Sequence, residues 1–193
     1  MNTKQKGNNF ERDCSRMLSL WWTGGKRDDA IWRSASSGAL TTVGRGRYLA
    51  HTGDFAATDA EAAPLFDKVI IEAKRGYNRY SVQDLLDMTP EAGAKNPTWQ
   101  MFSKLADTCF SQIKFGFLIW KRDRRGMLVF MLSRPTYKLH FESTGIKMEV
   151  HSPKWSYYGM SWNDFTLNVS ADQIRSWPGS PVASSSSTQL TPA

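Results

Sequence analysis

The stretch 69-VIIEAKRG-76 is an apolar, β-branched run of strand length that ends in charged residues. Side chains of a strand alternate between the two faces of a sheet, so Ile70, Glu72 and Lys74 share one face. Apolar residues on both faces predict a central strand that is covered on each side. Burial of Glu72 and Lys74 must be compensated, either by mutual pairing or by a metal ion. The stretch therefore predicts a charged site at the end of a buried strand.

The composition of the 193-residue chain is typical of one globular domain, with 40% apolar and 12% aromatic residues. No apolar run approaches the roughly 20 residues of a membrane span, and the N-terminus lacks the apolar stretch of a signal peptide. We therefore expect a cytoplasmic protein with no membrane partner. Residues 178–193 are rich in Ser and Pro and are predicted to be a disordered tail, which leaves residues 1–177 as the domain.

The charge of the chain favours a polyanionic partner. Its net charge is +7 and its pI is near 9.5, a balance typical of nucleic-acid-binding proteins, although many basic proteins are simply soluble. The cysteines Cys14 and Cys109 form no CxxC pattern, so we expect reduced, buried thiols rather than a zinc site.

Hydrophobic periodicity predicts an α/β domain. Apolar residues at helical spacing predict helices over 8–22 and 98–112. Strands are expected over five segments: 31–36, 52–57, 68–74, 115–120 and 127–132. Three further segments are expected to connect these elements: an acidic connection over 58–67, a long polar connection over 75–97 and a hairpin over 121–126. The pattern assigns no structure to 136–177, and the remaining order predicts a mixed central β-sheet flanked by helices.

Asp54 is the expected partner of the charged strand end. It follows Gly53 in the preceding predicted strand, and the 18 positions before Glu72 allow the two carboxylates to lie side by side. Adjacent carboxylates repel each other unless a proton or a divalent cation lies between them. Oxygen ligands without His or Cys favour Mg²⁺ or Mn²⁺. Two alternatives remain open: Glu72 and Lys74 as an exposed ion pair, and Asp54 as a turn residue.

The pattern Asp54…Glu72-Ala73-Lys74 resembles the signature of the PD-(D/E)XK nuclease superfamily, an Asp followed after a variable gap by (Asp/Glu)-x-Lys. The segments 6-KGNNFER-12 and 33-RSASSG-38 are similar to the first helix and first strand of archaeal Holliday junction resolvases. The resemblance covers residues 6 to 132 and implies a restriction-endonuclease-like core in the order α-β-β-β-α-β. Gly53 stands where the consensus has Pro, and the connection after Lys74 is longer than a compact resolvase needs.

The resemblance also implies roles for individual residues. Asp54 and Glu72 would bind Mg²⁺ or Mn²⁺, with the Ala73 carbonyl as an additional ligand, and Glu11 would reach the metal directly or through water. Lys74 would orient the attacking water and stabilise the transition state. In-line attack on the phosphodiester would leave a 5′-phosphate and a 3′-hydroxyl.

Two of the implied site residues have structural alternatives. Asn8 and Glu11 also have the spacing of a helix capping box. Ser37 is expected to be an accessory group near the phosphate, although Ser37-Gly38 also suits a strand end.

Basic side chains near the site are candidates for contact with DNA: Arg33, Arg45, Arg47, Arg75 and Arg79. By contrast, 121-KRDRR-125 is expected to be a solvated hairpin tip.

The sequence thus predicts a metal-dependent DNA endonuclease that resembles Holliday junction resolvases, for which a homodimer with two sites would suit a symmetric junction. The alternatives are a restriction- or repair-type endonuclease, an exonuclease, or a basic DNA-binding protein with the same fold and no activity.

Overall fold

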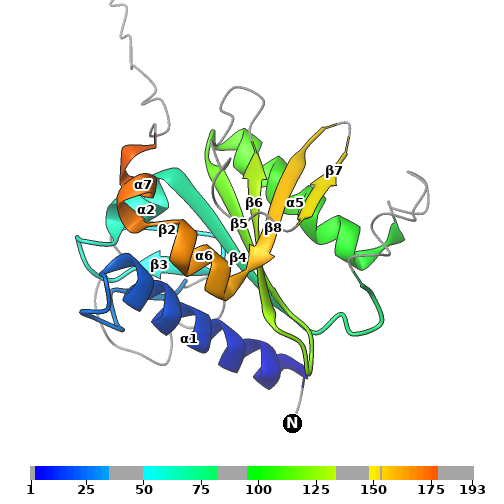
Figure 1. The fold of residues 1–193 in the computed structure, drawn as a ribbon, viewed down its shortest axis with the longest axis horizontal. Helices are drawn as coiled ribbons and strands as arrows, with labels where there is room; N and C mark the ends of the chain where they lie inside the picture. Colours follow the sequence, from blue (N-terminus) through cyan, green and yellow to red (C-terminus); the bar gives the residue numbers. More distant parts are fainter. Residues whose placement is uncertain (1–2, 35–49, 82–94, 134–147, 153, 178–193) are drawn as a thin grey trace, which may run out of the picture.

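The computed structural model describes residues 3–34, 50–81, 95–133, 148–152 and 154–177. Its larger sheet has five strands in the order β4-β5-β6-β8-β7 (Figure 1). Their bounds are β4 (Val69–Arg75), β5 (Phe115–Lys121), β6 (Met127–Ser133), β7 (Met148–His151) and β8 (Ser156–Ser161). β4 and β5 run parallel and the other pairs are antiparallel, which confirms the predicted mixed sheet of an α/β domain.

A smaller antiparallel sheet has the order β1-β3-β2, with β1 (Ile31–Arg33), β2 (Ala50–Thr52) and β3 (Phe55–Ala57). The prediction of one strand over 52–57 is wrong, because the chain turns at Gly53 and Asp54 and makes two strands that pair with each other. β4 is likewise not central in its own sheet but lies at its end. A single parallel bridge between Gly53 and Ile71 joins β4 to the smaller sheet.

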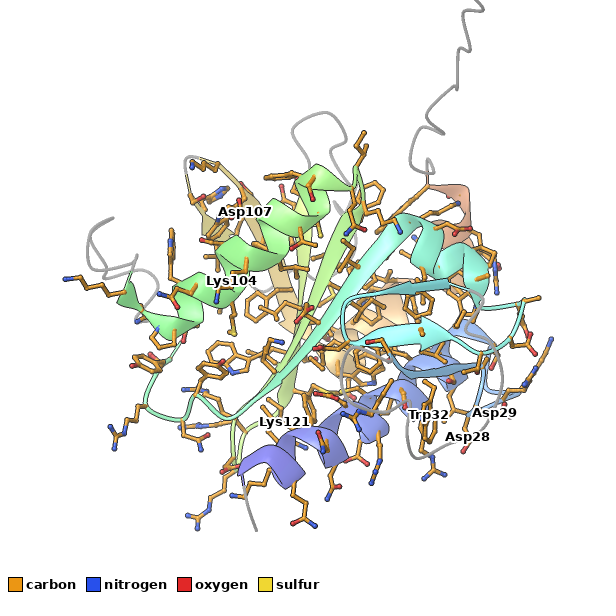
Figure 2. All side chains as sticks on the ribbon, turned by 180° about the vertical axis from the view of Figure 1, so that it is seen from behind. Asp28, Asp29, Trp32, Lys104, Asp107 and Lys121 are labelled. Atoms are coloured by element: carbon orange, nitrogen blue, oxygen red, sulfur yellow. The ribbon has the colours of Figure 1, made fainter. Side chains whose placement is uncertain are left out.

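Helices cover both faces of the larger sheet. α1 (Thr3–Trp22) packs on the face that carries Val69 and Ile71, and α5 (Pro97–Ser111) packs on the opposite face, beside Ile70 (Figure 2). The shorter helices are α2 (Ala63–Lys68), α6 (Trp162–Asn168) and α7 (Ala171–Ser176), and their buried residues join the core on the α1 side. Two separate cores result, divided by the strands.

Most of the predicted elements are present, with shifted ends. α1 begins five residues before the predicted start, α5 is displaced by one residue, and the 121–126 segment joins two antiparallel strands as predicted. The acidic connection expected over 58–67 is wrong in its second half, where α2 begins with a proline in its first turn. The unassigned segment 136–177 supplies β7, β8, α6 and α7.

Both cysteines are buried free thiols, as predicted, and burial raises the pKa of Cys14 well above its usual value. Within the described residues, no helix combines the length and the apolar character that crossing a bilayer requires.

Trp177 is the last core residue of the described chain, at the expected end of the domain. Its ring centroid lies 4.5 Å from that of Phe115, and its side chain is 8% exposed. A variant that ends at Trp177 should melt at the same temperature as the full chain. A variant that ends at Ser176 should lose about 3 kcal/mol of unfolding free energy, because it removes a packed indole. Thermal and denaturant unfolding of both variants measures this, and equal stabilities would contradict it.

Candidate active site

The alternation of β4 divides its side chains as predicted. Val69, Ile71 and Ala73 enter the core under α1, whereas Ile70 enters the core under α5. Glu72 and Lys74 share the face of Ile70 but lie farther along the strand, where their side chains are 26% and 29% exposed. The two charged groups therefore lie at the margin of the core, with partial access to solvent.

Asp54 reaches β4 from the turn between β2 and β3. Its backbone N–H donates to the Ile71 carbonyl over 3.0 Å, and its Oδ2 accepts from the Ala73 N–H over 2.9 Å. The turn thus continues the hydrogen bonding of β4 at the edge opposite β5. Asp54 is a turn residue, as one alternative held, and it is also the partner of the charged strand end.

Gly53 makes this approach possible. Its φ of 73° lies in the left-handed region, and a Cβ there would lie 2.5 Å from the Ile71 carbonyl oxygen. Proline, the consensus residue at this position, has φ near −65° and cannot adopt this conformation. The departure from the consensus is therefore explained by the local backbone.

Ser34 holds the turn from the other side, a role that the sequence pattern did not predict. Its Oγ donates to the Gly53 carbonyl over 2.8 Å, and its backbone N–H donates to the Asp54 carbonyl over 2.9 Å. The side chain is fully buried. Ser34 lies in the segment 33-RSASSG-38, but the residue of that segment predicted to lie near the phosphate was Ser37.

The Lys74 ammonium lies between the two carboxylates. Its Nζ is 2.5 Å from Glu72 Oε2 and 3.3 Å from Asp54 Oδ2. Burial raises the pKa of Glu72 and the nearby Asp54 carboxylate raises it further, whereas Lys74 lowers it. Burial lowers the pKa of Lys74, but the two carboxylates outweigh that effect and raise it. The structure thus brings the three predicted residues together as one cluster of interacting charges.

Glu11 lies on the α1 side of the same strand edge. Because α1 begins at Thr3, Asn8 and Glu11 are interior helix residues, and the capping-box alternative is wrong. Glu11 Oε2 accepts from Arg33 Nε over 2.6 Å, and Asn8 Oδ1 accepts from the same guanidinium over 3.0 Å. Burial raises the pKa of Glu11, Arg33 lowers it, and the Asp54 carboxylate raises it. Glu11 therefore lies within electrostatic range of the cluster but is held by Arg33.

The predicted DNA contacts fall into three groups. Arg33 has a side chain only 5% exposed and bound to Glu11, so it positions that carboxylate rather than facing a nucleic acid. Arg75 is half-buried, and its Nη2 lies 3.6 Å from Asp123 Oδ1. Arg79 is exposed in the segment after β4. Ser37, Arg45 and Arg47 lie outside the described residues.

A divalent cation fits the donor chemistry of this cluster. In the described part of the chain, no group of three or more His, Cys, Asp and Glu side chains is arranged to hold a metal. The available donors are the carboxylates of Asp54 and Glu72 and the backbone carbonyl of Ala73. That carbonyl points to the same side of the strand as the Ala73 N–H, toward Asp54.

The spacing of the carboxylates agrees with this donor set. Asp54 Oδ2 and Glu72 Oε2 both contact Lys74 Nζ, so the two oxygens are no farther apart than the sum of 3.3 and 2.5 Å. Mg²⁺ binds such hard oxygens at about 2.0–2.1 Å. The Lys74 ammonium lies between Asp54 Oδ2 and Glu72 Oε2, so these two oxygens already converge on a positive charge.

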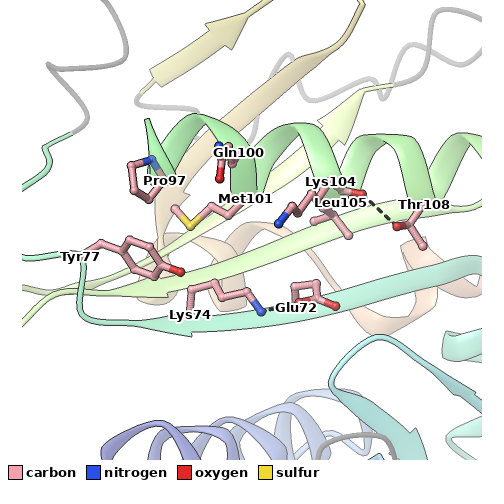
Figure 3. Close-up of a pocket in the computed structure, with 9 residues that line it drawn as sticks. All are labelled: Glu72, Lys74, Tyr77, Pro97, Gln100, Met101, Lys104, Leu105 and Thr108. Atoms are coloured by element: carbon pink, nitrogen blue, oxygen red, sulfur yellow. Dashed lines mark hydrogen bonds and ion pairs between the residues drawn. The ribbon is translucent and has the colours of Figure 1, made fainter. Parts of the chain in front are cut away.

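A groove opens beside the cluster, between β4 and α5. It has a volume of about 350 Å³ and is lined by Glu72 and Lys74 on the strand and by Gln100 and Lys104 on the helix (Figure 3). The cluster is therefore accessible to a ligand from the α5 side.

Comparison with known proteins gives one family. A family model described as "Phage putative PDDEXK endonuclease" matches residues 2–176. No curated protein and no solved structure matches this chain.

The close approach at Gly53 yields a matched pair of substitutions. Gly53→Ala should lower the unfolding free energy by about 3 kcal/mol, because the new methyl group meets the Ile71 carbonyl and the backbone is left-handed. Gly25→Ala has a similar positive φ of 84° but no neighbour within 4 Å, so it should lose only about 1 kcal/mol. Denaturant unfolding measures both, and equal losses would show that the contact with β4 is unimportant.

Proposed function

Because the chain belongs to this family of phage PDDEXK endonucleases, we propose that it hydrolyses phosphodiester bonds in DNA with the help of a divalent metal ion. The observation that carries the proposal is the convergence of Asp54, Glu72 and Lys74 at the edge of β4. Two carboxylates and an amine in this arrangement combine hard oxygen ligands with a group that stabilises negative charge.

In the proposed reaction, one group of residues binds the metal ion and Lys74 acts on the water and the phosphate. Asp54, Glu72 and the Ala73 carbonyl would hold Mg²⁺ or Mn²⁺, and Glu11 would contribute directly or through water. When bound, the ion supplies charge stabilisation and lowers the pKa of a bound water. Lys74 donates hydrogen bonds that orient the attacking water and stabilise charge on the phosphate oxygens.

Attack of the water on phosphorus forms one P–O bond and breaks the bond to the 3′-oxygen. The water loses one proton to solvent and the leaving 3′-oxygen takes one up, so the products are a 5′-phosphate and a 3′-hydroxyl.

A Holliday junction resolvase remains the favoured specific activity. It is supported by the similarity of 6-KGNNFER-12 to the first helix of those enzymes and by the place of Glu11 beside Arg33 at the site. A symmetric four-way junction would require two sites, and hence a homodimer. A restriction- or repair-type endonuclease or an exonuclease would use the same cluster, and a strictly monomeric protein would favour these alternatives.

A DNA-binding protein without activity is the remaining alternative. Its main support is the net charge of +7, which accounts for binding but not for two part-buried carboxylates placed around one ammonium. Burying like charges together is costly, and a binding surface alone gives no reason for it.

Cleavage should depend on both carboxylates and on the ion. We expect Asp54→Asn and Glu72→Gln to lower cleavage at least about a hundredfold, because each removes a metal-binding charge. EDTA should abolish activity, and Mg²⁺ or Mn²⁺ should restore it. The assay compares four-way junctions, flaps, linear duplex and single strands.

The matched control is Asp172→Asn, because Asp172 is exposed and pairs only with Arg175 in the ion pairs of the described chain. It should cleave like the wild type. Wild-type protein that cleaves no DNA in the panel with either ion would refute the proposal.

Lys74 should act on turnover rather than on affinity. Lys74→Ala is expected to lower kcat at least about a hundredfold while Kd for DNA changes less than about threefold, since its interaction strengthens in the transition state. Single-turnover cleavage and equilibrium binding, measured on the same DNA, separate the two effects. Equal losses in both would make Lys74 a phosphate anchor.

A further inference from the structure

The groove between β4 and α5 extends well beyond the catalytic cluster. Gln100 and Lys104 are one helical turn apart on α5 and form a polar wall, while Met101 and Leu105 add apolar surface from the same helix. Tyr77 lies at the end of the groove, three residues after Lys74 (Figure 3). Polar and apolar groups are thus combined along one cavity that opens directly onto Glu72 and Lys74.

Lys104 is the exposed cation of this groove. None of the ion pairs found among the described residues involves it, whereas Lys74 and Arg75 both pair with carboxylates. Its ammonium extends from α5 toward the strand that carries Lys74 and Glu72 (Figure 3). An ammonium in this position is suited to bind a phosphate of a strand whose neighbouring phosphate lies at the catalytic cluster.

Tyr77 is held in an uncommon backbone conformation. Its φ is 56°, and the preceding Gly76 has φ of 101°. The Gly76 N–H donates to the Lys121 carbonyl and the Tyr80 N–H donates to the Tyr77 carbonyl, each over 3.0 Å, which fixes the segment. Left-handed backbone at an aromatic residue is costly, and strained residues of this kind cluster at active sites and ligand sites. Here it directs a half-buried ring to the groove.

The size of the groove limits what it can hold. A volume of about 350 Å³ is at the lower end of small-ligand pockets, which suits one nucleotide and excludes a duplex. Aromatic and apolar side chains suit a base or a sugar, and Lys104 suits a phosphate.

We propose that the groove binds the nucleotide adjoining the scissile phosphate, turned out of the helical stack, with its phosphate on Lys104 and its base or sugar on Tyr77. This inference rests on the proposed nuclease function. Turning a nucleotide out of a duplex costs a few kcal/mol and costs least where the nucleotide is already unpaired. The enzyme therefore prefers DNA with an unpaired nucleotide at the cleavage site over fully paired duplex.

The test uses two labelled DNAs of the same sequence, a duplex with a one-nucleotide bulge and the fully paired duplex, with binding measured in EDTA. Wild-type protein should bind the bulged DNA about tenfold more tightly. Tyr77→Ala should lose this preference, and Tyr77→Phe should keep it. Tyr77→Leu retains much of the buried volume without the ring, so it should behave like Tyr77→Ala even if the alanine variant is unstable.

Lys104→Ala should weaken binding to both DNAs and lower the slope of log affinity against log salt by about one, because one phosphate contact is lost. Lys104→Arg should restore the slope. Lys154→Ala removes an exposed charge beyond β7, at the other end of the sheet order from β4, and should match the wild type.

Equal binding of both DNAs by wild-type protein, or an unchanged salt slope in Lys104→Ala, would overturn the groove assignment. These results are separate from the nuclease test. Active enzyme with no such effects would refute the groove alone, and the predicted binding by a protein that never cleaves DNA would refute only the nuclease function.

Discussion

The docking of the Gly53-Asp54 turn on the edge of β4 is the contact on which the site depends. Asp54 uses its backbone to pair with Ile71 and its carboxylate to accept from the Ala73 N–H, so one residue both joins the two sheets and presents an acid to Glu72 and Lys74. Ser34, directly after β1, supports the turn, and only glycine allows the approach at position 53. A shift of this turn would separate the carboxylates.

The charges at this edge compensate one another in two groups. Lys74 lies between Asp54 and Glu72, and Arg33 holds Glu11. Part-buried ion pairs of this kind contribute little net stability, because desolvation offsets most of the attraction. Their arrangement is consistent with the proposed function, in which carboxylates held close together bind a divalent cation.

The site lies where the two cores separate. Glu72 and Lys74 face the α5 side, and Glu11 and Arg33 come from the α1 side, so the edge of β4 is reached from both layers. Under the proposed function, a DNA strand that follows the groove would pass Lys104 on the helix before reaching the cluster, so the proposed binding and catalytic groups would form one continuous surface. The conformation of Tyr77 at the end of that groove fits a substrate with a displaced nucleotide.

The nuclease superfamily was predicted from the resemblance of Asp54…Glu72-Ala73-Lys74 to its signature. Local pattern was enough to predict the two long helices, the main strands and the shared face of Glu72 and Lys74. Each depends on periodicity or spacing within a short stretch, where the pleat of a strand or the turn of a helix sets the direction of side chains. The split of 52–57 into two strands was not predictable in this way, because it depends on a backbone contact with Ile71, 18 positions away. Three other contacts were also not predictable from local pattern: the ion pair of Arg33 with Glu11, the hydrogen bond of Ser34 to Gly53, and the position of Lys104 on the groove beside Glu72 and Lys74. Such contacts join residues that are distant along the chain, so only the tertiary packing of the helices and strands decided them.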